Sequence, residues 1–108
     1  MNKETRTRRQ AFDITGTISV PSGLKVEVRF DLIEMQDFVD GIPGRNYSYG
    51  VLRFREPLEP SVEQRLLSAT RLTLRGGGIQ ATLCLYKLNS FTVISANEFS
   101  VDAERVAA

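Results

Sequence analysis

Hydrophobic and polar residues alternate strictly in two neighbouring stretches near the start of the chain. In the first stretch every second residue from Phe12 to Val20 is apolar or glycine, and in the second every second residue from Leu24 to Leu32 is apolar. A period of two predicts two β-strands, each with one buried and one exposed face. The short connection Pro21-Ser22-Gly23 predicts that the two strands form an antiparallel hairpin.

The alternation also predicts the register of this hairpin, because a slip of one residue would expose one apolar face. The expected apolar pairs are Val20–Leu24, Ile18–Val26, Gly16–Val28, Ile14–Phe30 and Phe12–Leu32. A glycine in the middle of a strand indicates a bend, a bulge or the close approach of another element. The side chains expected to be most buried are Ile14, Ile18, Val26, Val28, Phe30, Leu66, Leu83 and Leu85.

Shorter alternating stretches follow, and they predict further strands near residues 47–54, 71–75, 79–86, 91–96 and 99–101. A helix is expected at about residues 61–69, where Ser61 and Gln64 have the spacing of a capping box. The predicted fold class is therefore mainly β: an antiparallel barrel, roll or sandwich of six to seven short strands with one short α-helix.

The chain of 108 residues has the length of one domain. Residues 1–9 carry four basic residues against one acidic residue, a net charge of +3, and they contain no apolar residue after Met1. This composition predicts a flexible basic arm, followed by a single β-rich domain at residues 10–103 and a frayed tail at 104–108. Residues 34–46 show no sustained period and are expected to form a long loop with turns at Asp40-Gly41 and Pro43-Gly44.

Several classes of chemistry are absent from the sequence. There is no histidine, which removes the commonest general base and metal ligand, and no phosphate-loop or dinucleotide-binding motif occurs. We therefore expect no enzyme activity, no cofactor and no metal, although a mechanism that uses carboxylates alone stays open. A single cysteine, Cys84, is typical of a reducing compartment and predicts a cytoplasmic location. No apolar run approaches the roughly 18 residues of a membrane helix, so no membrane partner is expected.

The leading functional expectation is a non-enzymatic binding or assembly module that acts through protein–protein contacts as an oligomer. Loops on a rigid sheet commonly carry recognition, and the expected long loop contains apolar residues. The candidate partner-binding residues lie in and directly after this loop: Met35, Phe38, Ile42, Arg45, Tyr47 and Tyr49. The partner would be a second copy of the chain or another protein. The alternative is a purely structural role, in which these side chains cover one end of the core.

A second hypothesis is a small β-barrel that binds a nucleotide or nucleic acid, with tyrosines stacking on bases and arginines contacting phosphates. Its candidate contacts, beside Arg45 and Tyr47, are Arg6, Arg8, Arg9, Arg53, Arg75, Gly76 and Gly77. The three consecutive glycines after Arg75 could form an anion-binding nest, but they are also typical of a plain hairpin turn.

One further feature of the hairpin concerns two aspartates. In the expected register Asp13 and Asp31 face each other, and like charges in that arrangement are unfavourable. They could bind a cation or share a proton. Alternatively, Arg29, which lies diagonal to Asp13, neutralises them near an exposed strand end.

Overall fold

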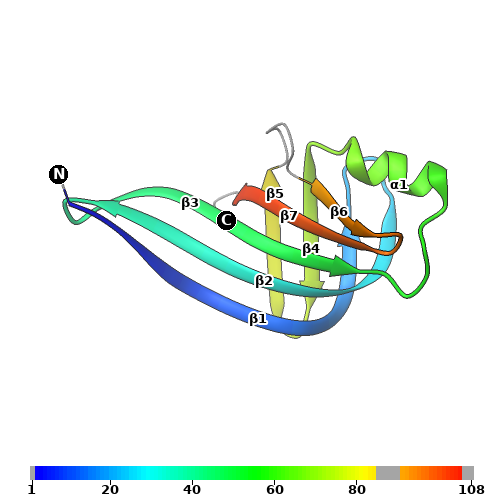
Figure 1. Cartoon of the computed structure of the whole chain (residues 1–108), viewed down its shortest axis with the longest axis horizontal. Helices are drawn as coiled ribbons and strands as arrows, with labels where there is room; N and C mark the ends of the chain where they lie inside the picture. The colour runs from blue at the N-terminus through cyan, green and yellow to red at the C-terminus, as the bar shows by residue number, and fades with distance from the viewer. Residues whose placement is uncertain (1, 85–90, 106–108) are drawn as a thin grey trace.

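The computed structural model describes residues 2–84 and 91–105 and shows a mainly β protein (Figure 1). Its elements follow in the order β1 (Lys3–Ser19), β2 (Lys25–Val39), β3 (Ile42–Arg53), α1 (Pro60–Leu67), β4 (Arg71–Gly76), β5 (Ile79–Cys84), β6 (Phe91–Ser95) and β7 (Glu98–Arg105). The expected mainly β fold with one short helix is thus confirmed for the described residues. The expected turn near Asn89 and the side chain of Leu85 lie outside them.

All strand pairings are antiparallel, in the order β3-β2-β1-β4-β5-β7-β6. The strand β3 also pairs with β7, from Tyr47–Glu104 to Arg53–Glu98, so the sheet curls strongly round on itself. The link between β5 and β7 consists of only two residue pairs, because the remainder of that edge of β7 pairs with β6. The architecture is therefore a curled sheet that does not close into a complete barrel.

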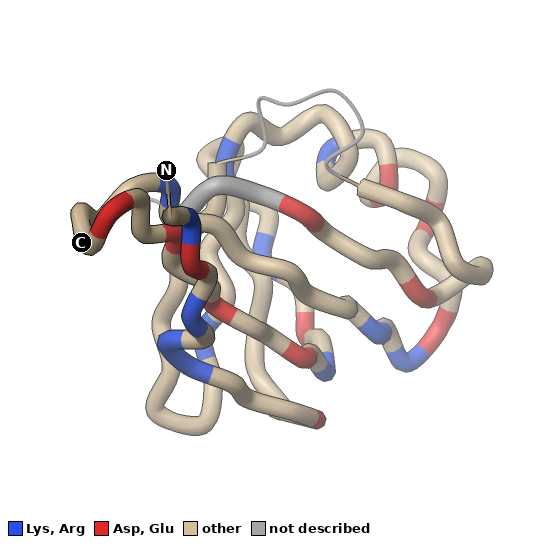
Figure 2. The backbone as a smooth tube through the Cα atoms, turned by 60° about the vertical axis from the view of Figure 1, so that its left-hand side comes forward, with Lys and Arg blue, Asp and Glu red and all other residues tan. Residues whose placement is uncertain are grey.

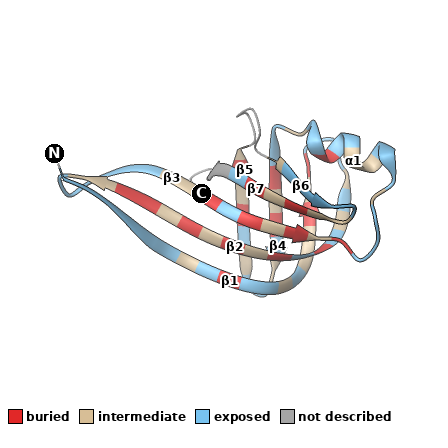
Figure 3. Cartoon of the chain, viewed as in Figure 1, coloured by how far each residue is buried: buried red, intermediate tan, exposed pale blue. Residues whose placement is uncertain are grey.

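The hydrophobic core fills the inner face of this curled sheet (Figure 3). Of the side chains expected to be most buried, five are buried: Ile18, Val28, Phe30, Leu66 and Leu83. Ile14 and Val26 are partly buried against the same cluster. Leu66 is the residue through which α1 joins the core.

The expected register of the first hairpin holds only up to a bulge. The pairs Ile18–Val26, Gly16–Val28 and Ile14–Phe30 are present as predicted. Between Ala11 and Ile14 the register shifts, so that Ala11 pairs with Leu32 in place of Phe12. The one extra residue in β1 turns Phe12 out of the core, and the prediction that it lies on the buried face is wrong.

Residues 34–46 do not form the expected loop. The strand β2 continues to Val39, and β3 begins at Ile42 after a two-residue turn. Both turn residues have positive φ, 51° at Asp40 and 79° at Gly41, which is the backbone of a type I′ hairpin turn. The Asp-Gly dipeptide was the correct signal, while the second expected turn, at Pro43-Gly44, lies within β3.

The structure also differs from the expectation of a flexible arm at residues 1–9. Residues 3–9 belong to β1 and pair with β2, beginning at Lys3–Val39. Polar side chains do not prevent this, because the backbone of β2 supplies the hydrogen-bond partners and ion pairs join the two strands. The outer halves of β1, β2 and β3 thus project together as a three-stranded arm (Figure 1), and the molecule measures 47 × 28 × 25 Å.

The helix α1 begins one residue earlier than expected. Its N-cap is Glu59, which makes no side-chain capping bond, so the predicted capping box of Ser61 and Gln64 is wrong. Pro60 suits the first turn because its fixed φ is helical and its missing N–H needs no partner there. In the described part of the chain no helix is long and apolar enough to span a bilayer.

Candidate functional site

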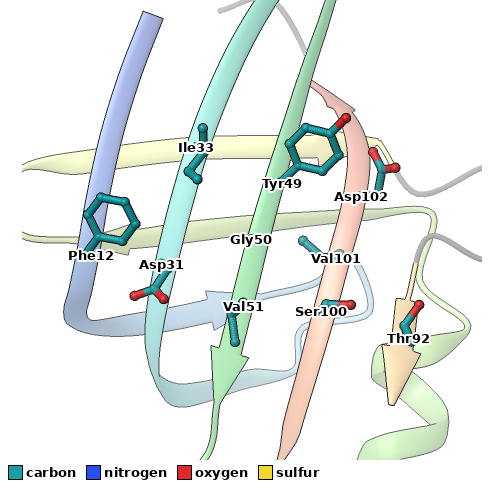
Figure 4. A pocket seen from close by; sticks show the side chains of 10 residues that line it. All are labelled: Phe12, Asp31, Ile33, Tyr49, Gly50, Val51, Thr92, Ser100, Val101 and Asp102. Carbon is teal, nitrogen blue, oxygen red and sulfur yellow. The ribbon is translucent and has the colours of Figure 1, made fainter. Parts of the chain in front are cut away.

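Three neighbouring strands place a group of apolar side chains on the side of the sheet that faces away from the core. Side chains alternate along a strand. Phe30 and Leu32 of β2 and Leu52 of β3 are buried, so the residues that alternate with them in these strands point outward. We call this group the outer apolar face; its members are Phe12, Ile33, Met35, Tyr47, Tyr49 and Val51. In Figure 4 four of them lie on one side of the sheet, with β4 and β5 behind it.

The outer apolar face contains an open hollow of about 270 Å³. Phe12 stands at its β1 side, and Tyr49 and Val51 form its middle, while Ser100 of β7 and Thr92 of β6 complete the far side (Figure 4). Phe12 is 57% exposed and Tyr49 is 44% exposed. Two large aromatic side chains thus remain accessible beside a mostly apolar hollow.

A cluster of charged groups holds the bulge that presents Phe12. Asp13 takes a left-handed backbone conformation, with φ of 55°, and its N–H donates to Oδ1 of Asp31 at 2.7 Å. Arg29 donates to the Asp13 carboxylate, and Arg53 donates to Oδ2 of Asp31 at 2.6 Å. The bonds from Arg53 hold the pKa of Asp31 below its usual value, although burial opposes the shift.

In the described structure the two aspartates form ion pairs with arginines. The expected contact between Arg29 and Asp13 is present, and each carboxylate has its own arginine. The role of the cluster is positional, because a bulge re-aims the side chains beside it. Among the described residues no three His, Cys, Asp or Glu side chains are grouped so that they could hold a metal ion.

A second line of contacts orders the aromatic residues of β3. The guanidinium of Arg45 lies 4.7 Å from the centre of the Tyr47 ring, and the rings of Tyr47 and Tyr49 meet edge to face at 5.4 Å. The Tyr47 hydroxyl donates to Asp37 at 3.3 Å. Burial raises the pKa of Tyr49, and Tyr47 and Asp102 add to the rise. These contacts fix the orientation of the tyrosines within the chain.

The structure brings together four of the six residues predicted to bind a partner. Met35, Tyr47 and Tyr49 belong to the outer apolar face, and Arg45 stacks beside them. Phe38 lies an odd number of residues from Met35 along β2, so it faces the other side, where the guanidinium of Arg6 stacks 4.5 Å from its ring centre.

Ile42, the remaining predicted residue, follows the turn at the tip of the arm and is 68% exposed, away from the hollow. Sequence reasoning missed Phe12, Ile33 and Val51 as site residues. Ile33 and Val51 could have been recognised from the sequence, since each is an apolar residue at an outward position of its strand. Phe12 could not, because its outward position depends on the bulge.

The residues of the alternative nucleic-acid site do not gather in one place. Acidic partners already engage three of the arginines: Arg6 bonds to Glu4, Arg9 to Glu34, and Arg53 to Asp31 and Glu98. Arg8 makes no ion pair within the described residues. Figure 2 shows positive and negative residues interspersed along the strands, without a large region of one sign.

The glycine cluster of the alternative site is a structural turn. Gly76 ends β4, and Gly77 and Gly78, with φ of 56° and 79°, form the two-residue turn into β5. Arg75 pairs with Thr17 of β1 and Gln80 of β5 within the sheet. The backbone there is used in strand pairing, and no anion nest is formed. Comparison with known proteins gave no match among protein-family models, curated proteins or solved structures.

Proposed function

We propose that this protein is a non-enzymatic binding module that acts through protein–protein contacts at its outer apolar face, with a second copy of the chain as its first partner. The observation that carries the proposal is the exposure of Phe12 and Tyr49 on a face that three strands hold rigid. Aromatic residues are enriched in the centre of protein interfaces, where they bury large areas at a small entropic cost. Exposed apolar patches of a few hundred Å² are often functional surfaces.

The size of the face fits association at micromolar concentrations. At their observed exposures Phe12 and Tyr49 together present about 200 Å². With the four partly buried members, the apolar area is about 350 Å² per copy, so a contact between two copies buries about 700 Å², which at 25 cal/mol per Å² corresponds to about 17 kcal/mol. Association itself costs about 4–15 kcal/mol, so a weak to moderate complex is expected.

The nucleotide or nucleic-acid alternative has less support. Counterion release requires cations that are available to phosphates, and Arg6, Arg9 and Arg53 are already paired with carboxylates. The tyrosines could stack on bases, but Tyr47 is covered on one side by Arg45. The free thiol of Cys84 supports a cytoplasmic location as part of the proposal.

The proposal is tested by sedimentation velocity between about 1 and 100 μM. We expect the wild-type protein to form a larger particle as its concentration rises, because burial of the outer apolar face drives association. The variant Tyr49→Lys places a charge at the centre of the face and should remain monomeric. The matched control is Ile42→Lys, which changes an even more accessible apolar residue at the arm tip and should associate like the wild type.

Two results would contradict the proposal. One is a wild-type protein that stays monomeric at about 100 μM. The other is equal association of the Tyr49 and Ile42 variants, which would place the contact elsewhere. Far-ultraviolet circular dichroism of each variant checks that the sheet is unchanged, so that any loss of association can be attributed to the substituted side chain.

A further inference from the structure

We infer that Phe12 is the anchor of a two-fold contact, in which each copy of the chain inserts its Phe12 ring into the hollow of the other. The inference rests on the proposed function and adds the anchoring residue, its receptor and the symmetry of the contact. It starts from an arrangement seen in one chain: a projecting aromatic ring and an apolar hollow lie side by side on one face.

The hollow has the size and the lining that a phenyl ring needs. Its volume is about 270 Å³, whereas a protein cavity of about 150 Å³ is enough to bind benzene. Ile33, Tyr49 and Val51 supply apolar walls. Two carboxylates also line the hollow: that of Asp31 is engaged by Arg53, and that of Asp102 is exposed and would have to stay in contact with solvent when a ring enters.

The protein holds Phe12 outward at an energetic cost. The regular alternation of β1 would bury this ring opposite Leu32, and the bulge removes it from the core. The bulge also requires a left-handed conformation at Asp13, which aspartate adopts more readily than most residues other than glycine. Hydrogen bonds from Arg29 and to Asp31 hold this conformation in place. Bulges of this kind commonly re-aim a side chain next to a functional site.

A second copy is the occupant that this arrangement fits. In a two-fold contact both partners use the same patch, so the ring of one copy and the hollow of the other meet twice in a single interface. The apolar face of about 350 Å² per copy, with a polar rim of the usual proportion, gives about 1,200 Å² in total, the lower limit for a specific dimer.

The edge of β1 does not offer an equally good route to a dimer. From Lys3 to Gly16 this edge pairs with no other described strand, but two bulges and the charged residues of the arm interrupt it. Charges and bulges are the devices by which proteins prevent edge-to-edge pairing. Face-to-face contact through the hollow is therefore the better supported geometry.

Sedimentation equilibrium of Phe12→Ser tests the role of the ring. We expect its dimer dissociation constant to rise at least about ten-fold, as for an interface anchor. The matched control is Val93→Ser, because Val93 is similarly exposed, at 60%, but does not line the hollow. The control should change the constant less than about three-fold. Phe12→Leu, which still fills an apolar hollow, should lie between the wild type and the serine variant.

A photo-cross-linking experiment tests the receptor site. With p-benzoylphenylalanine in place of Phe12, irradiation should give a covalent dimer whose cross-linked peptides contain Ile33, Tyr49 or Val51 of the second copy. The same group in place of Leu67, which is exposed on α1, should give no dimer. A dimer cross-linked at other positions would overturn the assignment of the hollow.

The outcomes separate this inference from the proposed function. If Tyr49→Lys abolishes association but Phe12→Ser does not, the outer apolar face binds a partner without Phe12 as anchor, and only the inference fails. If neither variant changes the association, both fail. If both variants weaken it and the cross-links fall in the hollow, both stand.

Discussion

A side chain on Gly16 has no room, because a Cβ atom there would lie 1.9 Å from the carbonyl oxygen of Arg75. The contact is reciprocal, since a Cβ on Gly76 would lie 2.5 Å from the carbonyl oxygen of Thr15. The backbones of β1 and β4 therefore pass in direct contact at this point. Here β1 bends from the three-stranded arm into the curled body, and a glycine in each strand permits the approach.

We predict that Gly16→Ala lowers the free energy of unfolding by about 3 kcal/mol, since the strands must separate to admit one methyl group. Urea unfolding followed by circular dichroism measures the change. The control is Gly44→Ala, where the nearest atom is 3.6 Å from the added Cβ, and it should cost about 1 kcal/mol or less. Equal losses in the two variants would show that the backbones of β1 and β4 do not approach each other as closely as described.

Removing the Phe30 ring tests the position of the core. Phe30 is fully buried, so we expect Phe30→Ala to cost about 3–5 kcal/mol through lost burial and the cavity that remains. Phe12→Ala removes the same ring from an exposed position, and it should cost less than about 1 kcal/mol in the monomer. Thermal unfolding at low protein concentration compares the two. A larger loss for Phe12 than for Phe30 would show that the two faces of the hairpin are exchanged.

The pair Arg9–Glu34 should stabilise the arm measurably. Glu34 is only 3% exposed, and Arg9 bonds to its carboxylate from the neighbouring strand. We expect Arg9→Ala to cost about 1–3 kcal/mol, because it removes a charge-assisted hydrogen bond from a buried carboxylate. Arg8→Ala, which removes an exposed arginine one residue away, should change stability by less than about 0.5 kcal/mol.

The added variant Glu34→Gln tests the same pair by a double-mutant cycle in chemical denaturation. The second substitution should cost less in the Arg9→Ala background than in the wild type, since the charge that needed a partner is removed. Strictly additive losses would mean that the two side chains do not interact.

The lowered pKa of Asp31 predicts a specific acid sensitivity. Its folded-state pKa lies below the ordinary value of 3.8, so the folded protein binds this proton less readily than the unfolded chain. The contribution of Asp31 is therefore fully present above the unfolded value and is lost as the pH falls below 3.8 through the folded pKa. We expect Asp31→Asn to destabilise the protein at pH 7 and to reduce the dependence of stability on pH in this acid window. Denaturant unfolding from pH 7 to pH 2.5 provides the measurement.

The parts of the fold that the sequence predicts well are those where alternation and turn chemistry agree. The first hairpin and the later strands have local signals of this kind. The sequence pattern predicts a loop in place of the outer halves of β2 and β3, because the residues that face inward there are polar. Glu34 and Gln36 are buried in the structure, and the Gln36 amide donates to the carbonyl oxygens of Asp37 and Gly44. When the hydrogen-bond partners of a buried polar residue come together only in the folded structure, the sequence pattern alone cannot distinguish that residue from a loop residue.

The candidate site divides in the same way. The sequence names Tyr47, Tyr49 and Met35 as candidates because aromatic and apolar residues gather in that stretch, although the loop expected there is absent. Phe12 could not be named in this way, since its position depends on a bulge held by Arg29 and Asp31 of another strand. Alternation in β1 alone favours the buried position for that ring. The ion pairs that reverse it form only when the strands have assembled.

The spacing of the strand pairs along the chain also has a consequence for the order of folding. The turn at Asp40-Gly41 joins β2 and β3 directly, so their pairing closes only a short loop. The pairing of β3 with β7 joins residues as distant as Tyr47 and Glu104, and its loop-closure entropy is larger. The pairing of β1 with β4 joins residues equally far apart, so we expect the β2–β3 hairpin to form early and these two long-range pairings to form later. The Tyr49 side chain would then take its place early, whereas the hollow around it, which Thr92 and Ser100 complete, would exist only after β6 and β7 have docked.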